Sequence, residues 1–198
     1  IIGDFFVEKQ DATGAFQSWW TPSGKGVRLG GTNGAYAIWI LAELYRITHK
    51  TIYLEAAQRG MAYYIRNVVH ENMYWGDTLD ADCIDKEAGH AMMHALLLLY
   101  ELTGEREYLN AAIDAGYFIL TWMFYWDVPF DDKTILGRMN FRTFGWTVVS
   151  VENQHLDPYG LIISPDFVRL YKYTGDKFWL DTGLAMAKTV MCFISRYE

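Results

Sequence analysis

Apolar residues recur along the chain at intervals of three and four positions, in six stretches separated by polar breaks. This interval is typical of α-helices that bury one face. Three stretches are apolar on nearly every side, so we expect buried helices at 32–49, 86–103 and 158–174. The other three carry charged residues on one face, so we expect partly solvated helices at 51–69, 105–126 and 176–195.

Each buried helix is followed by its solvated helix after a very short break. The breaks are His49-Lys50, Gly104-Glu105 and Gly175-Asp176. Gly104 and Gly175 suit the left-handed position that ends a helix. Because so short a turn makes two helices antiparallel neighbours, we predict a single domain of three helical hairpins, at about 32–69, 86–126 and 158–195.

The three hairpins share a repeated sequence unit. In each copy, Leu-Tyr-x-x-Thr is followed at fixed spacing by an aromatic residue and a leucine, and a glycine precedes the tyrosine by eleven positions. The tyrosines are Tyr45, Tyr100 and Tyr171, and the glycines are Gly34, Gly89 and Gly160. A unit that recurs in this way indicates an array of equivalent supersecondary elements.

The LYxxTGxxxYL unit occurs at 99–109, at 170–180 with Trp179 in place of the second Tyr, and at 44–54 with His49 in place of Gly. These units resemble those of the six-hairpin (α/α)6-toroid carbohydrate-active enzymes. This resemblance implies an all-α fold, in which antiparallel helical hairpins form a partial or complete (α/α) toroid. The group contains glycoside hydrolases, unsaturated-uronide hydrolases, polysaccharide lyases and sugar 2-epimerases. Because the sequence has three hairpins instead of six, we expect a fragment of a longer toroid, an open array, or a homodimer that completes the surface.

Signals for β-strands are weak. Residues 142–151 are β-branched and aromatic, which predicts a short strand or an extended loop, and we expect no substantial sheet. Pro165 falls inside the third buried helix, so we expect a kink there or a new helix start at Ser164.

Composition narrows the classes of partner. The formal net charge of −7 disfavours nucleic acid, and no apolar run approaches the roughly 20 residues of a membrane helix. No phosphate-binding loop is present, so no cofactor is expected. Two cysteines are too few for a disulfide framework and leave the cellular compartment unknown. Part of the 17% aromatic content belongs to the core, and part suits a stacking surface for a ligand.

The long segments of the chain, 1–31, 70–85 and 127–157, each lead into a buried helix. In an antiparallel array they therefore meet at one end, and long loops on a rigid scaffold often carry function. We predict that this end, here called the rim, holds the functional site.

One acidic cluster begins the second hairpin and contains Asp80, Asp82, Asp85 and Glu87. Glycoside hydrolysis usually needs two carboxyl groups, one protonated and one ionised. Crowded carboxylates raise one another's pKa, which makes a general acid available at neutral pH. The alternative is that these acids only begin a helix or remain solvated.

A second cluster precedes the third hairpin and contains Glu152, Asn153, Gln154, His155 and Asp157. Such side chains offer the donors and acceptors that sugar hydroxyls require. Glu152 or Asp157 would form the catalytic pair with Asp85 or Glu87. The alternative is an internally hydrogen-bonded loop in which Asp157 caps the helix that begins at Pro158.

Other residues are candidate substrate contacts. His90 shares a helix face with Glu87 and His94, but no HExxH pattern is present, so we expect a cavity or core face and no metal. Trp75 and Trp146 suit stacking on a pyranose, or else belong to the core. Arg142 suits a uronate carboxylate, or pairs with an acid of the chain. Tyr159 and Asp82 complete this set.

We therefore predict an enzyme that acts on an oligosaccharide or glycan, with a glycoside hydrolase favoured. A sugar epimerase that moves protons through His155 and His90 is the first alternative. A non-catalytic glycan-binding or structural array is the second.

Overall fold

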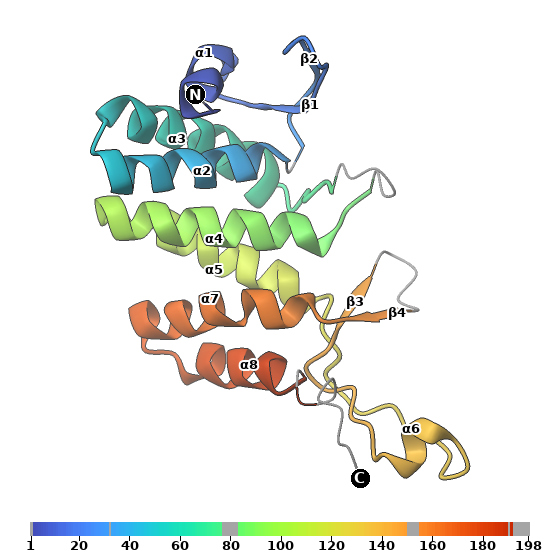
Figure 1. Ribbon diagram of the computed structural model, residues 1–198. Helices are drawn as coiled ribbons and strands as arrows, with labels where there is room; N and C mark the ends of the chain where they lie inside the picture. Colours follow the sequence, from blue (N-terminus) through green and yellow to red (C-terminus); the bar gives the residue numbers. More distant parts are fainter. Residues whose placement is uncertain (1, 32, 77–82, 150–154, 190, 192–198) are drawn as a thin grey trace. The chain divides into compact units, whose positions relative to one another are not determined.

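A computed structural model describes residues 2–31, 33–76, 83–149, 155–189 and 191. Within these residues the chain is mostly helical, with eight α-helices, one π-helical turn and two two-stranded sheets (Figure 1). The all-α class predicted from the sequence is confirmed at this level. The contacts divide the chain into two compact units, Ile1–Ile119 and Leu120–Glu198, here called unit 1 and unit 2.

Unit 1 contains the first two predicted hairpins and an N-terminal extension. Its elements are α1 (Ile2–Lys9), β1 (Gln17–Trp20), β2 (Gly26–Leu29), α2 (Asn33–Thr48), α3 (Thr51–Tyr64), the π-turn η1 (Ile65–Val69), α4 (Lys86–Thr103) and α5 (Arg106–Leu120, which ends at the unit boundary). Helix α2 packs against both α3 and α4. Helices α2 and α4 begin at the same end of the unit (Figure 1).

Unit 2 contains the third hairpin and the long connection before it. Its elements are α6 (Ile135–Arg138), β3 (Thr147–Val149), β4 (His155–Asp157), α7 (Tyr159–Thr174) and α8 (Lys177–Lys188). Strand β3 pairs antiparallel with β4 and leads the chain into α7, which packs against α8.

Two of the three repeated glycines explain how closely the helices of one hairpin approach. A Cβ atom added at Gly89 would lie 2.7 Å from Cδ1 of Phe118 and 2.9 Å from Cγ1 of Ile119, both on α5. At Gly34 the added atom would overlap the Tyr64 hydroxyl at the end of α3. At these two positions only glycine leaves this space, so the first two hairpins keep a close contact between their paired helices. Gly160 in the third hairpin has more room, because an added Cβ would lie 3.3 Å from Cγ2 of Thr147 and 3.5 Å from Cγ of Met186.

The ends of the three buried helices also repeat. The backbone N–H groups of His49, Gly104 and Gly175 each donate to the carbonyl of the repeat tyrosine, at 2.8 Å. All three residues have a left-handed backbone, with φ of 58°, 75° and 73°. The predicted left-handed helix ends at Gly104 and Gly175 are confirmed, and His49 adopts the same conformation without being glycine.

The structure differs from the prediction in its short elements. Helix α1 and the β1–β2 hairpin occupy the N-terminal segment, where the sequence predicted only a connection. Helix α5 ends at Leu120 and does not reach Trp126. The reason is that the residues after Leu120 form backbone hydrogen bonds with β3 and the residue before it. The Phe124 N–H donates to the Trp146 carbonyl, and the Val148 N–H donates to the Trp122 carbonyl.

Helix α7 continues through Pro165 instead of restarting at Ser164. Proline has no N–H to donate to the carbonyl four residues earlier, which is that of Leu161. The Ser164 hydroxyl donates to this carbonyl at 2.8 Å and replaces the missing bond. The serine before the proline therefore compensates for it and does not begin a new helix.

Candidate functional site

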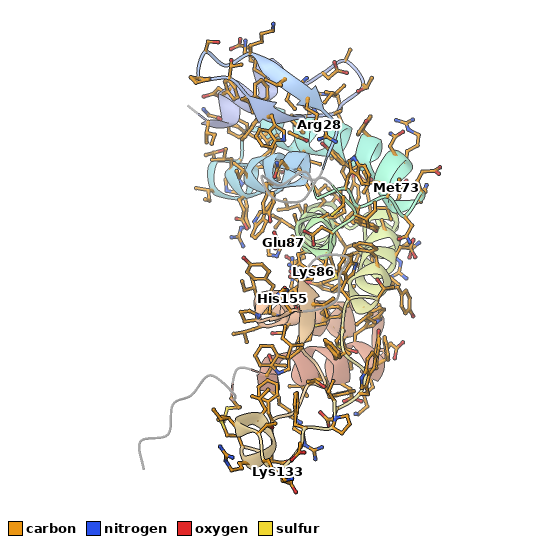
Figure 2. All side chains as sticks on the ribbon, turned by 90° about the vertical axis from the view of Figure 1, so that its right-hand side faces the viewer. Arg28, Met73, Lys86, Glu87, Lys133 and His155 are labelled. Carbon is orange, nitrogen blue, oxygen red and sulfur yellow. The ribbon has the colours of Figure 1, made fainter. Side chains whose placement is uncertain are left out.

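Two segments of unit 1, the β1–β2 hairpin and the connection before α4, lie where α2 and α4 begin. Figure 2 looks onto this end, with Arg28 labelled on β2, Met73 on the connection before α4, and Glu87 at the start of α4. In Figure 1 the β1–β2 hairpin and the connection before α4 lie at the right-hand side of the unit. Helix α1 lies elsewhere, because a Cβ atom at Gly3 would meet Leu44 near the end of α2, and Asp4 accepts a hydrogen bond from the Tyr53 hydroxyl near the start of α3. The prediction that the long segments share one end is therefore confirmed in unit 1 for the β1–β2 hairpin and the connection before α4, and it is wrong for α1.

Asp85 is the N-cap residue of α4. It is buried, its backbone is extended, and its Oδ1 accepts from the backbone N–H of Glu87 at 3.3 Å. Its own N–H donates to the Tyr74 carbonyl. This is the helix-start role that the sequence allowed as the alternative to catalysis.

Helix α4 exposes one narrow stripe of side chains. Over 85–99, all of which the structure describes, every residue is buried except Glu87, His90 and His94, which are partly exposed. Their spacing of three and four residues places them on one face. A helix whose other residues over this range are buried thus partly exposes a carboxylate and two histidine side chains, although Nε2 of His90 is itself buried.

Two aromatic side chains of α2 adjoin this stripe. The ring centroids of Trp39 and His94 are 3.7 Å apart, and the rings are tilted by 32°. Tyr36 is exposed, and its ring stacks near that of Trp39 at a centroid distance of 6.3 Å. We call Tyr36, Trp39, Glu87, His90 and His94 the α2–α4 stripe.

Sequence reasoning selected Glu87 and His90, placed His94 on the same cavity or core face without selecting it, and missed Tyr36 and Trp39. The signal was present in the three-residue spacing of Tyr36 and Trp39, but the surrounding apolar run concealed it. No three His, Cys, Asp or Glu residues come together as a metal site among the residues that the structure describes. Glu87 and His94 are seven residues apart, or about 10 Å along a helix axis.

Asp157 has a structural role in unit 2. It is buried, and its Oδ1 accepts from the Thr147 hydroxyl and from the backbone N–H of Tyr159, the latter at 3.0 Å. The Thr147 oxygen in turn accepts from the N–H of Gly160 at 3.2 Å. These bonds join β3 to the start of α7, as in the capping alternative.

The other residues that the sequence predicted to contact substrate differ in how exposed their side chains are. Trp75 is exposed and forms an isolated bridge with Ile84. His155 on β4 and Tyr159 at the start of α7 are also exposed. Trp146 is buried against Phe141, with ring centroids 5.5 Å apart, which favours the core role over a stacking surface.

Arg142 is exposed and pairs with an acid of its own chain. Its Nη1 donates to Oδ2 of Asp127 at 2.9 Å, while Oδ1 of Asp127 accepts from the backbone N–H of Phe144 at 3.1 Å. The other predicted residues, Asp82, Glu152, Asn153 and Gln154, lie outside the described residues, as does Asp80.

Within the described part of the chain, none of the helices combines the length and hydropathy needed to span a membrane. No family model matches the sequence, and no curated protein matches it. Among solved structures, the Lin0763 protein from Listeria innocua is similar over the whole of this chain, with a TM-score of 0.63 and 18% identity. The two proteins share a fold. The chain spans about half of Lin0763, 53% of its length.

Proposed function

We propose that this protein is a carbohydrate-active enzyme, with glycoside hydrolysis as its reaction, and that the α2–α4 stripe binds the sugar. The observation that supports this is the contact between Trp39 and His94, which joins an aromatic surface to the helix face that carries Glu87. Aromatic rings stack on the apolar faces of pyranoses, and carboxylates and imidazoles hydrogen-bond sugar hydroxyls.

Glu87 is the proposed general acid. The sequence left Asp85 and Glu87 as alternatives, and Asp85 is buried and committed to the start of α4. Glu87 is partly exposed beside the two imidazoles, so it has access to a bound substrate. In the second cluster Asp157 is likewise engaged in hydrogen bonds at the start of α7, so the second carboxyl group is not assigned to it.

We further propose that the hairpins belong to an (α/α) toroid. The helix ends support this, because the bond to the repeat tyrosine carbonyl and the left-handed backbone recur in all three hairpins. The similarity to a protein about twice as long is compatible with additional hairpins.

A sugar epimerase is the second candidate. It is favoured by the two imidazoles on the stripe, His90 and His94, because imidazole is the side chain best suited to proton transfer near neutral pH. An epimerase would change no product mass, but it would exchange a carbon-bound proton with solvent.

The test is mass spectrometry of products from a panel of neutral and uronate-containing oligosaccharides. Hydrolysis adds one water per cleaved bond, whereas epimerisation in deuterated water adds only deuterium.

Glu87→Gln should lower turnover by about 100-fold or more, as expected for loss of a general acid. Glu55→Gln is the matched control, because Glu55 is exposed on α3. Full activity of Glu87→Gln, or no product from any substrate, would refute the proposal.

A further inference from the structure

Unit 2 contains a pocket of about 770 Å³ between α8 and the connection that precedes β3. The connection contributes Met123, Tyr125, Asp127, Arg142 and Phe144. Helix α8 contributes Phe178, Asp181, Thr182, Leu184, Ala185 and Lys188, and Thr189 follows the helix. The volume is in the range of pockets that bind small organic molecules.

The wall opposite α8 is held in place by hydrogen bonds. The Gly145 N–H donates to the Phe124 carbonyl at 3.0 Å, and the Thr143 hydroxyl donates to that of Trp126 at 2.7 Å. The Tyr125 hydroxyl donates to the Leu120 carbonyl at 2.7 Å, which fixes its ring. Gly145 lies so close to the Ala185 carbonyl on α8 that a Cβ would not fit. The pocket is therefore preformed, which lowers the entropic cost of binding.

Three aromatic rings of the pocket are half exposed. The exposed fractions are 50% for Tyr125, 47% for Phe144 and 44% for Phe178. Hydration of this much apolar surface is unfavourable, and a hollow that concentrates it is typical of a binding site. A flat ring is the ligand shape that can cover such side chains.

Among the charged residues that line the pocket, Lys188 is available to pair with a ligand. Both oxygens of Asp127 accept hydrogen bonds, from Arg142 and from the Phe144 N–H. Both oxygens of Asp181 accept from Lys177, at 2.7 and 2.8 Å, outside the pocket lining. Lys188, by contrast, is exposed and has no hydrogen bond or ion pair within the described part of the chain. Arg142 also keeps N–H groups beyond the one that Asp127 uses.

The geometry points to a second binding site, in which this pocket holds a ring-bearing carboxylate. The ring lies against Tyr125, Phe144 and Phe178, and the carboxylate pairs with Lys188, aided by Arg142. A neutral ligand would leave the cation unused, and a cation would be repelled by it. The site goes beyond the proposed function, because it shares no residue with the α2–α4 stripe.

Isothermal titration calorimetry with two matched pairs of ligands tests the site and separates two sources of the carboxylate. The pairs are para-nitrophenyl β-glucuronide against the corresponding glucoside, and para-nitrobenzoate against para-nitrobenzamide. In at least one pair the anion should bind about tenfold tighter than its neutral analogue, the size expected for one charge-assisted hydrogen bond. A preference only within the first pair identifies a sugar acid, and only within the second an aromatic acid.

Variants locate the binding. Lys188→Gln should abolish the preference for the anion while leaving the neutral analogue unchanged, and Phe144→Ala should weaken both. Lys172→Gln is the charge-matched control, because Lys172 is exposed on α7 and does not line the pocket. The proposal is wrong if neither anion binds, if anion and neutral analogue bind equally, or if Lys188→Gln keeps the preference.

Discussion

At the scale of single residues, Tyr74 is an unusual buried group. Its side chain is fully buried and stacks on Phe118, with ring centroids 4.0 Å apart. Its hydroxyl has no hydrogen-bond partner among the described residues. Burial raises the pKa of Tyr74 well above its usual value of 10.0, and the negative charge of Asp114 adds to the effect. The hydroxyl is thus a cost to stability at neutral pH and a source of alkaline sensitivity.

Tyr74→Phe tests both consequences. At neutral pH the variant should be as stable as the wild type or more stable by about 1 kcal/mol, because a buried unsatisfied hydroxyl is removed. A raised pKa in the folded state gives stability that is intact below pH 10 and is lost above it. The wild type should therefore lose about 1.4 kcal/mol per pH unit above pH 10 through this residue, and the variant should not.

Urea unfolding at a series of pH values measures the effect, with Tyr117→Phe as control because Tyr117 is exposed on α5. Parallel alkaline losses in wild type and Tyr74→Phe would contradict the assignment.

Residue identity alone could not separate capping from catalysis at the acidic clusters. Asp85 and Asp157 are the residue type that each role prefers, and only their hydrogen bonds with Glu87 N–H and Tyr159 N–H distinguish the two. The partial exposure of Glu87 depends on the neighbours of α4 and was equally invisible in the sequence.

At the scale of elements, the helices that the sequence predicted best are those in which the periodic pattern of apolar residues continues over many positions. Helix α4 was predicted to its bounds, because its period, its cap and its terminal glycine agree. Helix α1 and the β1–β2 hairpin were missed because they are short and depend on contacts outside themselves, such as the 4.8 Å ring contact of Phe5 with Trp20. The premature end of α5 likewise depends on pairing with a segment distant in sequence.

The repeat makes a prediction about His49, which has φ of 58° where the other two hairpins have glycine. A left-handed backbone costs a non-glycine residue about 1–2 kcal/mol, partly offset by the greater entropy of glycine in the unfolded chain. His49→Gly should therefore raise the free energy of unfolding by about 0.5–1 kcal/mol. Chemical denaturation measures this change. His49→Ala is the control and should give no gain; equal stabilisation by both would mean that the histidine side chain, and not the backbone, is unfavourable.

At the scale of the whole molecule, each unit has a core of its own. In unit 1 the core includes Met92 and Leu96 of α4, and in unit 2 it includes Phe167 and Trp179, whose rings stack 5.8 Å apart. The sequence predicted one domain, because similar repeats indicate similar hairpins. The repeats do not show how the contacts are distributed among the hairpins. The long connection before β3 supplies unit 2 with contacts that no repeat encodes, including the preformed pocket.

If each core stabilises its own unit, a packing defect should have local effects. Gly89→Ala would place a Cβ 2.7 Å from Phe118 in unit 1, and Gly183→Ala would place one 2.9 Å from the Ser164 carbonyl in unit 2. Each should destabilise its unit by about 1–3 kcal/mol, because a packed interface tolerates added volume poorly.

Hydrogen exchange measured for individual peptides distinguishes the effects of the two variants, since amide protection reports local opening. Gly89→Ala should accelerate exchange in α4 and α5 and leave α7 and α8 unchanged, and Gly183→Ala should do the reverse. Uniform acceleration by either variant would show that the two units unfold as one, as the single-domain prediction requires.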